Sequence, residues 1–283
     1  MKNQSRRNFL KLTGLTFALG SFPGFTKQFS GSIFAQGINK DEKLKLGLTS
    51  YTFRNFSLTQ TIEMTKRLGL KRISLKDMHL PLDSTNEQIA QAVAEVKNAG
   101  LELYGAGVIY MASEAEVNRA FEYAKAAGLK MIIGVPEHEF LPMVEKKVKE
   151  YDIIVAIHNH GPGDKRFPTP ESVYDKIKDM DKRMGLCLDI GHTMRMGIDP
   201  SVPAEKYFDR LYEIHIKDET EAAPSGSTVE IGRGVIDIPK FLKTLIRLNY
   251  KGTVSFEFEK DKEDPLPGVA ESLGYVKGVL SVI

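Results

Sequence analysis

The sequence between positions 153 and 192 reads IIVAIHNHGPGDKRFPTPESVYDKIKDMDKRMGLCLDIGH. Two short apolar runs, at residues 153–158 and 185–189, enclose a segment with helical spacing at residues 170–180. Both runs are rich in Val, Ile and Leu, as expected for parallel strands that are covered on both faces. Each run ends in a polar side chain, a histidine in the first and an aspartate in the second. This unit predicts a parallel sheet whose strands carry polar groups at their carboxyl ends.

The same alternation of strand-like and helical segments continues outward from this unit with a period of roughly 25–35 residues. We expect strands at residues 45–51, 72–75, 101–105, 130–135, 153–158, 185–189, 212–216 and 253–258. We expect helices at residues 58–68, 86–98, 114–127, 140–149, 170–180, 202–208, 238–248 and 269–279.

Eight strand–helix units in about 240 residues predict an α/β fold, a single (β/α)8 TIM barrel, for residues 41–283. An open doubly wound sheet is the alternative, but it usually has fewer strands and a glycine-rich first turn. The first expected strand instead leads into Tyr51-Thr52-Phe53-Arg54, which lacks phosphate-binding glycines. The one long connection, residues 217–237, is rich in Ala, Pro, Ser and Gly and predicts a mobile loop over the functional site.

The composition excludes several classes of protein. Of the 283 residues, 42% are hydrophobic and 27% are charged, which disfavours disordered, collagen-like and coiled-coil chains. The single cysteine, Cys187, excludes an intrachain disulfide and a cysteine-rich zinc module. Residues 1–35 hold five of the 39 Lys and Arg residues and no acid, so 34 basic side chains face 37 acidic ones in the remainder. This mildly acidic body is not that of a nucleic-acid-binding protein.

The N-terminus predicts export. Ser5-Arg6-Arg7-Asn8-Phe9-Leu10-Lys11 precedes a weakly apolar run at residues 12–25, and this order resembles a twin-arginine export signal. Glycines and a proline interrupt the run, which is also too short for a stable membrane span. We therefore expect residues 1–40 to be an export signal and linker, and the mature chain to be periplasmic or otherwise extracytoplasmic, with no membrane contact once the signal is removed.

All the histidines lie in or just beyond the carboxyl ends of expected strands, and none lies in an expected helix. They are His79, His138, His158, His160, His192 and His215. In a TIM barrel these strand ends meet on the catalytic face. A lone histidine is usually structural, but six at one end of a barrel indicate a metal or acid–base site.

Taking one polar residue from each of the last four strands predicts a metal site. These residues are His158, Asp189, His215 and Glu257. Two imidazoles and two carboxylates suit Mn²⁺, Zn²⁺, Co²⁺ or Fe²⁺ better than Mg²⁺ or Ca²⁺, which prefer oxygen ligands. The competing interpretations are a helix cap for Asp189 and an ion pair at the barrel rim for Glu257.

Five short stretches, taken in their order and spacing, resemble the sugar phosphate isomerase/epimerase superfamily, the xylose isomerase-like TIM barrels. They are Ala156-Ile-His-Asn-His-Gly161, Cys187-Leu-Asp-Ile-Gly-His192, His215-Ile-Lys-Asp218, Ile231-Gly-Arg-Gly-Val-Ile-Asp237 and Gly252-Thr-Val-Ser-Phe-Glu257. The resemblance implies that Asp189, His215 and Glu257 bind a divalent metal ion and that His192 contacts the substrate.

The chain departs from this family at the end of the fifth expected strand. The family has Glu-Asn-His there, and this sequence has His158-Asn159-His160. In the epimerases of the family, that glutamate is both a metal ligand and one of two proton-transfer bases. A histidine can still serve as ligand and base, but it removes one negative charge and leaves the metal a stronger Lewis acid. It also breaks the two-glutamate symmetry that suits inversion at a carbon.

The implied function is a metal-dependent sugar isomerase or epimerase that removes a proton next to a carbonyl. Glu257, with His158, is the expected base, and Lys217 or Lys76 is expected to stabilise the enediolate. We expect substrate contacts from side chains at the strand ends and in the long loop: His160, His192, Lys76 and Arg233.

Three alternatives remain. The same enediolate chemistry would make the chain a lyase or hydrolase that cleaves 3-keto-glycosides if a β-substituent leaves. A non-catalytic sugar-binding barrel would have no tightly bound metal. An abasic-site endonuclease would need ligands for three zinc ions and a basic groove, which the mildly acidic body does not favour. We expect a small-molecule carbohydrate as partner and no nucleic acid, and a homo-oligomer is compatible with the sequence.

Overall fold

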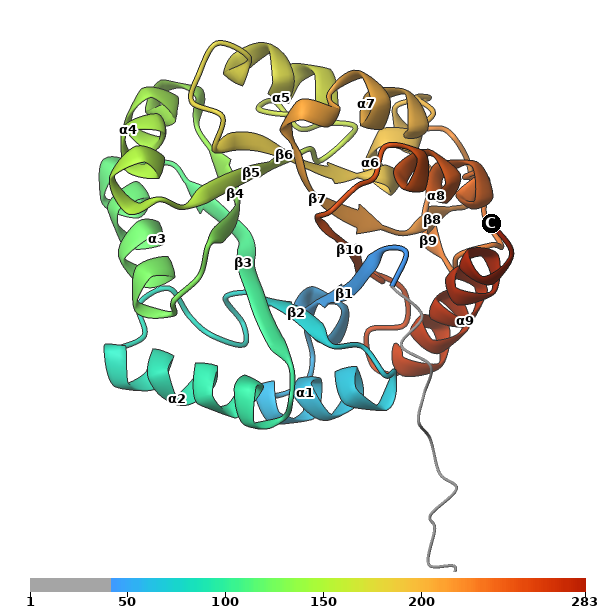
Figure 1. Cartoon of the computed structure of the whole chain (residues 1–283), viewed down its shortest axis with the longest axis horizontal. Helices are drawn as coiled ribbons and strands as arrows, with labels where there is room; N and C mark the ends of the chain where they lie inside the picture. The colour runs from blue at the N-terminus through green and yellow to red at the C-terminus, as the bar shows by residue number, and fades with distance from the viewer. Residues whose placement is uncertain (1–41) are drawn as a thin grey trace, which may run out of the picture. The chain divides into compact units, whose positions relative to one another are not determined.

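Eight parallel strands close into a barrel inside a ring of helices in the computed structural model, which describes residues 42–283 (Figure 1). The order of the strands around the barrel is β1-β10-β7-β6-β5-β4-β3-β2. They are β1 (Lys45–Thr49), β2 (Arg72–Leu75), β3 (Glu102–Met111), β4 (Met131–Pro136), β5 (Ile154–His158), β6 (Met184–Asp189), β7 (Leu211–Ile216) and β10 (Thr253–Phe256). The predicted TIM barrel is confirmed, and the predicted export segment lies outside the described residues.

The third strand runs further than its sequence pattern indicates. β3 continues to Met111 instead of ending at Gly105, and it pairs with β4 as far as Pro136. Glycines at positions 105 and 107 interrupt the pattern from which a strand is predicted. A Cβ at Gly107 would lie 2.2 Å from the backbone oxygen of Ile133, so the close approach of the two strands requires glycine there.

The helices cover the outside of the barrel (Figure 1). They are α1 (Leu58–Arg67), α2 (Asn86–Asn98), α3 (Glu114–Ala126), α4 (Leu141–Tyr151), α5 (Pro170–Ile177), α6 (Ile190–Arg195), α7 (Ser201–Lys206), α8 (Ile238–Arg247) and α9 (Leu266–Val282). Shorter 3₁₀ turns are η2 (Ser50–Phe53), η3 (His138–Phe140) and η4 (Phe208–Arg210). Within residues 42–283, no helix combines the length and the apolar character needed to cross a bilayer.

Helix α6 corrects a sequence-based expectation, because it contains His192, and η3 contains His138. The expectation that no histidine lies in a helix is therefore wrong. Six residues that follow a strand without a loop are too few for a helical period to show.

Local sequence fixes the ends of several helices. Ser57, Thr85 and Thr169 begin α1, α2 and α5 as capping boxes, so each satisfies a backbone N–H that lacks a partner inside its helix. Gly100 and Gly128 follow α2 and α3 with φ of 80° and 67°, a conformation that glycine adopts without strain. Buried Val, Ile, Leu and Phe side chains fill the layer between strands and helices.

The strand register brings polar residues to one end of the barrel. Asp189 of β6 lies opposite His215 of β7. β10 pairs with β7 through Phe256 and Ile216, and the next residue, Glu257, donates its backbone N–H to Ile216 O at 3.2 Å. Parallel pairing therefore places successive carboxyl ends side by side.

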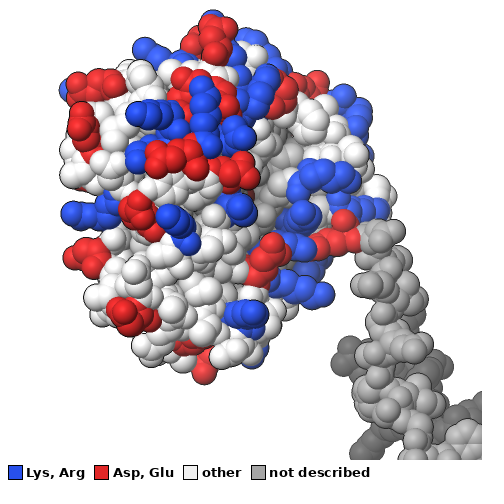
Figure 2. Space-filling view, turned by 60° about the vertical axis from the view of Figure 1, so that its left-hand side comes forward, with Lys and Arg blue, Asp and Glu red and all other residues white. Residues whose placement is uncertain are grey.

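Charged side chains of both signs are mixed on the face that Figure 2 presents. Figure 2 shows Lys and Arg interspersed with Asp and Glu over the face that it presents, and no continuous basic surface on that face.

The long connection at residues 217–237 is structured. It contains an antiparallel ribbon of β8 (Asp218–Glu219) and β9 (Thr228–Val229). The Asp218 carboxylate then accepts hydrogen bonds from the backbone N–H groups of Gly232, Gly234 and Ile236, at 2.9, 3.0 and 3.1 Å. Composition alone predicted a mobile loop here, because it does not show that one buried carboxylate holds the returning chain.

Replacing Asp218 by Ala is expected to lower the free energy of unfolding by about 3–5 kcal/mol, because three backbone N–H groups lose a charged acceptor. Urea unfolding measures the difference. Asp175→Ala is the matched control. In the described part of the chain Asp175 forms an exposed pair with Lys178, and its loss is expected to change stability by less than about 0.5 kcal/mol. A loss below about 1 kcal/mol for Asp218→Ala would show that this carboxylate does not hold the segment.

Candidate metal centre

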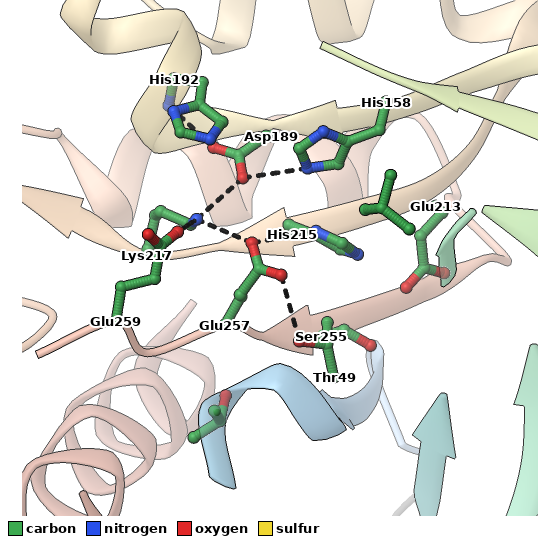
Figure 3. Close-up of polar contacts among 12 residues, drawn as sticks. Thr49, His158, Asp189, His192, Glu213, His215, Lys217, Ser255, Glu257 and Glu259 are labelled. Carbon is green, nitrogen blue, oxygen red and sulfur yellow. Dashed lines mark hydrogen bonds and ion pairs between the residues drawn. The ribbon is translucent and has the colours of Figure 1, made fainter. Parts of the chain in front are cut away.

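Four side chains converge at the carboxyl end of the barrel. His158, Asp189, His215 and Glu257 each offer one ligand atom, and these atoms lie within 4.8 Å of one another. They come from the ends of β5, β6, β7 and β10, and Figure 3 shows them pointing toward a common centre. All four are buried, with Glu257 the most exposed at 6%. The structure thus brings together the four residues that the sequence predicts as ligands.

The spacing of these atoms fits a shared cation. Nε2 of His158 lies 3.3 Å from Oδ2 of Asp189, and Nδ1 of His215 lies 3.2 Å from Oε2 of Glu257. Two ligands that are each about 2.1 Å from one ion lie roughly 3.0–3.4 Å apart at octahedral to tetrahedral angles. His158 Nε2 is also buried without a well-formed hydrogen bond, so it retains the lone pair that a divalent ion would use.

Asp189 acts both as a helix cap and as a candidate ligand. Its Oδ1 accepts a 2.7 Å hydrogen bond from the backbone N–H of His192 at the start of α6, and its Oδ2 faces His158. Asn159 fixes the same strand end, because its Oδ1 accepts the Asp189 backbone N–H at 3.0 Å. The cap and the ligand, which the sequence presents as alternatives, use different oxygens of one carboxylate.

Lys217 is buried among carboxylates. Its Nζ lies 3.0 Å from Asp189 Oδ2 and 2.7 Å from Glu257 Oε2, and it also contacts Glu259 (Figure 3). Burial by itself lowers the pKa of Lys217, but the three carboxylates outweigh burial and hold that pKa well above its usual range. The sequence predicts that this ammonium stabilises an enediolate, and the structure places it in contact with three acidic side chains of the candidate site.

Glu257 is held in its ionised form. Burial alone would raise the pKa of Glu257, but Lys217 and His215 outweigh burial and keep that pKa well below its usual range. Thr49 donates its hydroxyl to Oε1 at 3.2 Å, which orients the carboxylate. Sequence reasoning missed Thr49, because a threonine at the end of a strand carries no distinctive signal.

The histidines form a chain toward the cavity. Nδ1 of His158 lies 3.3 Å from Nδ1 of His160, and Nε2 of His160 lies 3.1 Å from the Tyr110 hydroxyl. Burial lowers the pKa of His158 well below its usual range and also lowers the pKa of His160. His158 is therefore neutral at physiological pH, which is the form that binds a metal ion.

A cavity of about 250 Å³ opens onto this centre. Its lining includes Tyr51, Lys76, Val108, Tyr110, His158, His160, His192, Glu257 and Glu259. Lys76 Nζ donates to the backbone oxygen of Val108 at 2.8 Å and lies 5.8 Å from the centre of the Tyr110 ring. Burial lowers the pKa of Lys76. Three of the residues expected to bind substrate, His160, His192 and Lys76, therefore line one cavity with two of the candidate ligands.

Other predicted residues lie elsewhere. Arg233 forms a bidentate pair with Glu271 of α9, at 2.5 and 2.7 Å, so its guanidinium is engaged outside the cavity that we expected it to reach. His79 is hydrogen-bonded to Ser50 and other polar groups outside the centre, and His138 lies 2.9 Å from the backbone oxygen of Arg166. Four of the six histidines therefore gather at the centre.

A further buried acid, Glu213, lies two residues before His215 on β7. Its Oε1 accepts a 2.6 Å hydrogen bond from Tyr104, and its Oε2 has no hydrogen-bond partner within residues 42–283. Burial is the main reason that the pKa of Glu213 rises to about 8. Sequence reasoning missed this residue, although the two-residue period of a strand places it on the same face as His215.

Comparisons with known proteins agree with this fold. The sequence matches the family described as Xylose isomerase-like TIM barrel over residues 54–279. An inosose dehydratase from Clostridium tetani is 29% identical over 152 residues, which are 47% of this chain and 50% of that protein. The rhizopine catabolism protein MocC from Rhizobium meliloti is 26% identical over 147 residues, 47% of this chain and 43% of that protein. The chain thus spans about half the length of these curated relatives.

Solved structures show the same barrel. An uncharacterized protein from Parabacteroides distasonis has a TM-score of 0.66 and 26% identity, covering 84% of this chain and 99% of its own. The 3-keto-D-glucoside 4-epimerase of E. coli also has a TM-score of 0.66, with 18% identity over 83% of this chain and 99% of its own. At that identity the second likeness is one of fold alone.

Replacing Glu213 by Gln is expected to stabilise the protein at alkaline but not at acidic pH. The unfolded carboxyl ionises near its ordinary pKa of 4.5, whereas the folded one stays protonated up to about 8, so the wild type loses stability as pH rises between these values. At pH 8.5 the variant should gain at most about 5 kcal/mol, at 1.4 kcal/mol per pKa unit. Urea unfolding with a chelator at pH 4 and 8.5 measures this, and a difference that is the same at both pH values would contradict it.

Proposed function

The chain belongs to the xylose isomerase-like TIM barrel family, and from this we propose that it is a metal-dependent sugar isomerase or epimerase. The observation that carries the proposal is the buried group of His158, Asp189, His215 and Glu257 beside a cavity of about 250 Å³. A volume of this size suits a monosaccharide unit rather than a polymer.

The reaction we propose is proton abstraction next to a carbonyl. A divalent ion held by the four side chains would supply a Lewis acid for a sugar carbonyl and the hydroxyl beside it. Mn²⁺, Zn²⁺ and Co²⁺ suit two imidazoles and two carboxylates. This ligand set agrees with the spacing of the side-chain atoms described above.

Glu257 is the proposed base. Its ionised carboxylate lines the cavity, and the hydroxyl of Thr49 orients Oε1, so an oxygen of fixed position can take the proton from the substrate carbon. His158, at the end of β5, is the second candidate base: its neutral imidazole can accept or return a proton when Asp189, His215 and Glu257 alone hold the ion.

Lys76 is the proposed group for the enediolate oxygen. Its ammonium lies in the cavity and donates to a backbone oxygen. It is therefore already positioned to stabilise the negative charge that develops on the enediolate oxygen. His160 and His192 line the same cavity, where they are placed to contact substrate hydroxyls.

A lyase or hydrolase acting on 3-keto-glycosides is the second candidate. His158 stands where the family usually has a glutamate, so the site lacks the pair of carboxylate bases that suits inversion. A single carboxylate base is enough for an elimination, in which abstraction of the acidic C2 proton is followed by departure of the O1 substituent. The similarity of half of the chain to an inosose dehydratase, an enzyme named for an elimination, supports this candidate.

We also propose that the chain works outside the cytoplasm. The twin-arginine pattern at the N-terminus supports export, and phosphorylated sugars would then be poor substrates. The remaining alternative is a non-catalytic sugar-binding barrel. The experiments below distinguish it from an enzyme.

Purified protein is expected to contain about one equivalent of Mn²⁺, Zn²⁺ or Co²⁺, and removing that ion with a chelator is expected to abolish turnover, since no Lewis acid remains. Metal analysis and a mass-resolved product screen with aldoses, ketoses and 3-keto-glycosides test this. Products of unchanged mass indicate isomerisation or epimerisation, and cleaved products indicate the lyase. If the screen detects no turnover and no deuterium uptake from D₂O at the α-carbon, the chain is a sugar-binding protein and not an enzyme.

Glu257→Gln is expected to lower kcat by at least about 1,000-fold, because the amide cannot accept the substrate proton. Glu263→Gln is the control, since Glu263 is hydrogen-bonded to Asn55 on the surface and its replacement should leave kcat unchanged. Steady-state kinetics on the substrate found in the screen measure both variants. A Glu257→Gln enzyme that keeps a tenth of the wild-type kcat would rule out Glu257 as the base.

A further inference from the structure

The ammonium of Lys217 contacts the same oxygens that a metal ion would use. These are Asp189 Oδ2 at 3.0 Å and Glu257 Oε2 at 2.7 Å, and each of them also faces a candidate histidine ligand. We propose that Lys217 is an internal cation that neutralises the two carboxylates when no ion is bound, and that its ammonium moves onto Glu259 alone when a divalent ion enters. This inference rests on the metal site of the proposed function.

Burial explains why an internal cation is needed. Asp189 is fully buried and Glu257 is 6% exposed, so water cannot stabilise their charges when the site holds no ion. Lys217 is itself 2% exposed, and its ammonium supplies the opposite charge inside the protein. A buried charge whose partner is removed is strongly destabilising, so the lysine keeps the ion-free site folded.

Competition follows from the shared oxygens. An ion bound to Asp189 Oδ2 and Glu257 Oε2 would repel an ammonium that keeps its present contacts with both, and this repulsion is strong where water is excluded. The ion-free contacts must therefore be given up before the ion is held tightly. The free energy that the lysine–carboxylate contacts contribute to the ion-free state is lost when the ion binds. These contacts therefore weaken the affinity of the site for the ion.

Glu259 is the alternative ion-pair partner for the displaced ammonium. Its carboxylate already contacts Lys217 Nζ, and its side chain is 32% exposed, so it lies toward solvent from the two buried carboxylates. Figure 3 shows Glu259 beside Lys217, on the side away from His158 and His215. Because the ammonium already contacts Glu259, the exchange we propose has to break only its contacts with Asp189 and Glu257.

Packing against Gly191 confines the aliphatic part of the Lys217 side chain. A Cβ at Gly191 of α6 would lie 2.5 Å from Lys217 Cγ and 2.6 Å from Cδ. Glycine at this position leaves a channel that fits the aliphatic stem, so the ammonium has a limited choice of partners.

Mn²⁺ binding to the metal-free full chain tests the proposal, with free Mn²⁺ followed by its electron paramagnetic resonance signal. Lys217→Met is expected to bind Mn²⁺ at least tenfold more tightly than the wild type and to have a lower Tm without metal. Damage to the fold would weaken binding, so a gain in affinity reports the loss of a competitor. Lys260→Met is the matched control, because Lys260 pairs with Glu230 and its replacement should leave the Kd unchanged.

Glu259→Gln gives an independent test if Lys217→Met does not fold. It is expected to weaken Mn²⁺ binding at least fivefold, because the displaced ammonium loses its alternative partner, and Glu263→Gln should not change the Kd. Where Lys217→Met folds, adding Glu259→Gln to it should have less than a twofold effect, since Glu259 acts through the lysine. A Glu259→Gln chain that binds Mn²⁺ like the wild type overturns the proposal.

The outcomes separate this proposal from the proposed function. If the wild type binds Mn²⁺ and Lys217→Met binds it equally or more weakly, the internal cation is overturned and the function stands. If only Lys217→Met binds, the internal cation is supported and metal-dependent function in the wild type is overturned. If neither chain binds, both proposals fall.

Discussion

Two carboxylates buried side by side are the constraint on which this site depends. Asp189 and Glu257 lie at the ends of strands that are both neighbours of β7, and a charge in such a position persists only where it is paired. Lys217 and the two imidazoles meet that requirement with contacts of 2.7–3.3 Å. The ionised state of Glu257 follows from this balance of charge, whereas burial keeps His158 neutral.

In each of the two carboxylates, one oxygen is hydrogen-bonded to the barrel and the other faces the candidate metal centre. Asp189 gives Oδ1 to the first turn of α6 and turns Oδ2 toward His158. Glu257 gives Oε1 to Thr49 of β1 and turns Oε2 toward His215. The oxygens that face the centre are therefore fixed by hydrogen bonds to the barrel itself. A site built this way is organised before any ligand arrives.

The barrel and the convergence of the four candidate ligands could be predicted because both follow from short-range patterns. Apolar runs that end in His158 or Asp189 indicate strands and their polar ends, and the parallel register then brings those ends together. The partners of individual side chains could not be predicted from the sequence, because they depend on contacts between segments that are distant in the chain. Arg233 with Glu271 and Asp218 with the loop at residues 232–236 are examples. Helix α6 was missed for the opposite reason, since it is too short to show a period.

The close packing of Lys217 against Gly191 is expected to make positions 191 and 217 vary together among related sequences. The stem of Lys217 fills the space that any larger residue at position 191 would need, so a lineage that retains the lysine is expected to retain the glycine. In a relative that has lost the lysine, alanine or serine at this position would have to displace only the Glu219 carboxylate, whose Oε1 would lie 2.6 Å from the added Cβ. The pair of positions would then serve as a sequence marker that sorts related barrels by whether their acidic centre carries its own ammonium.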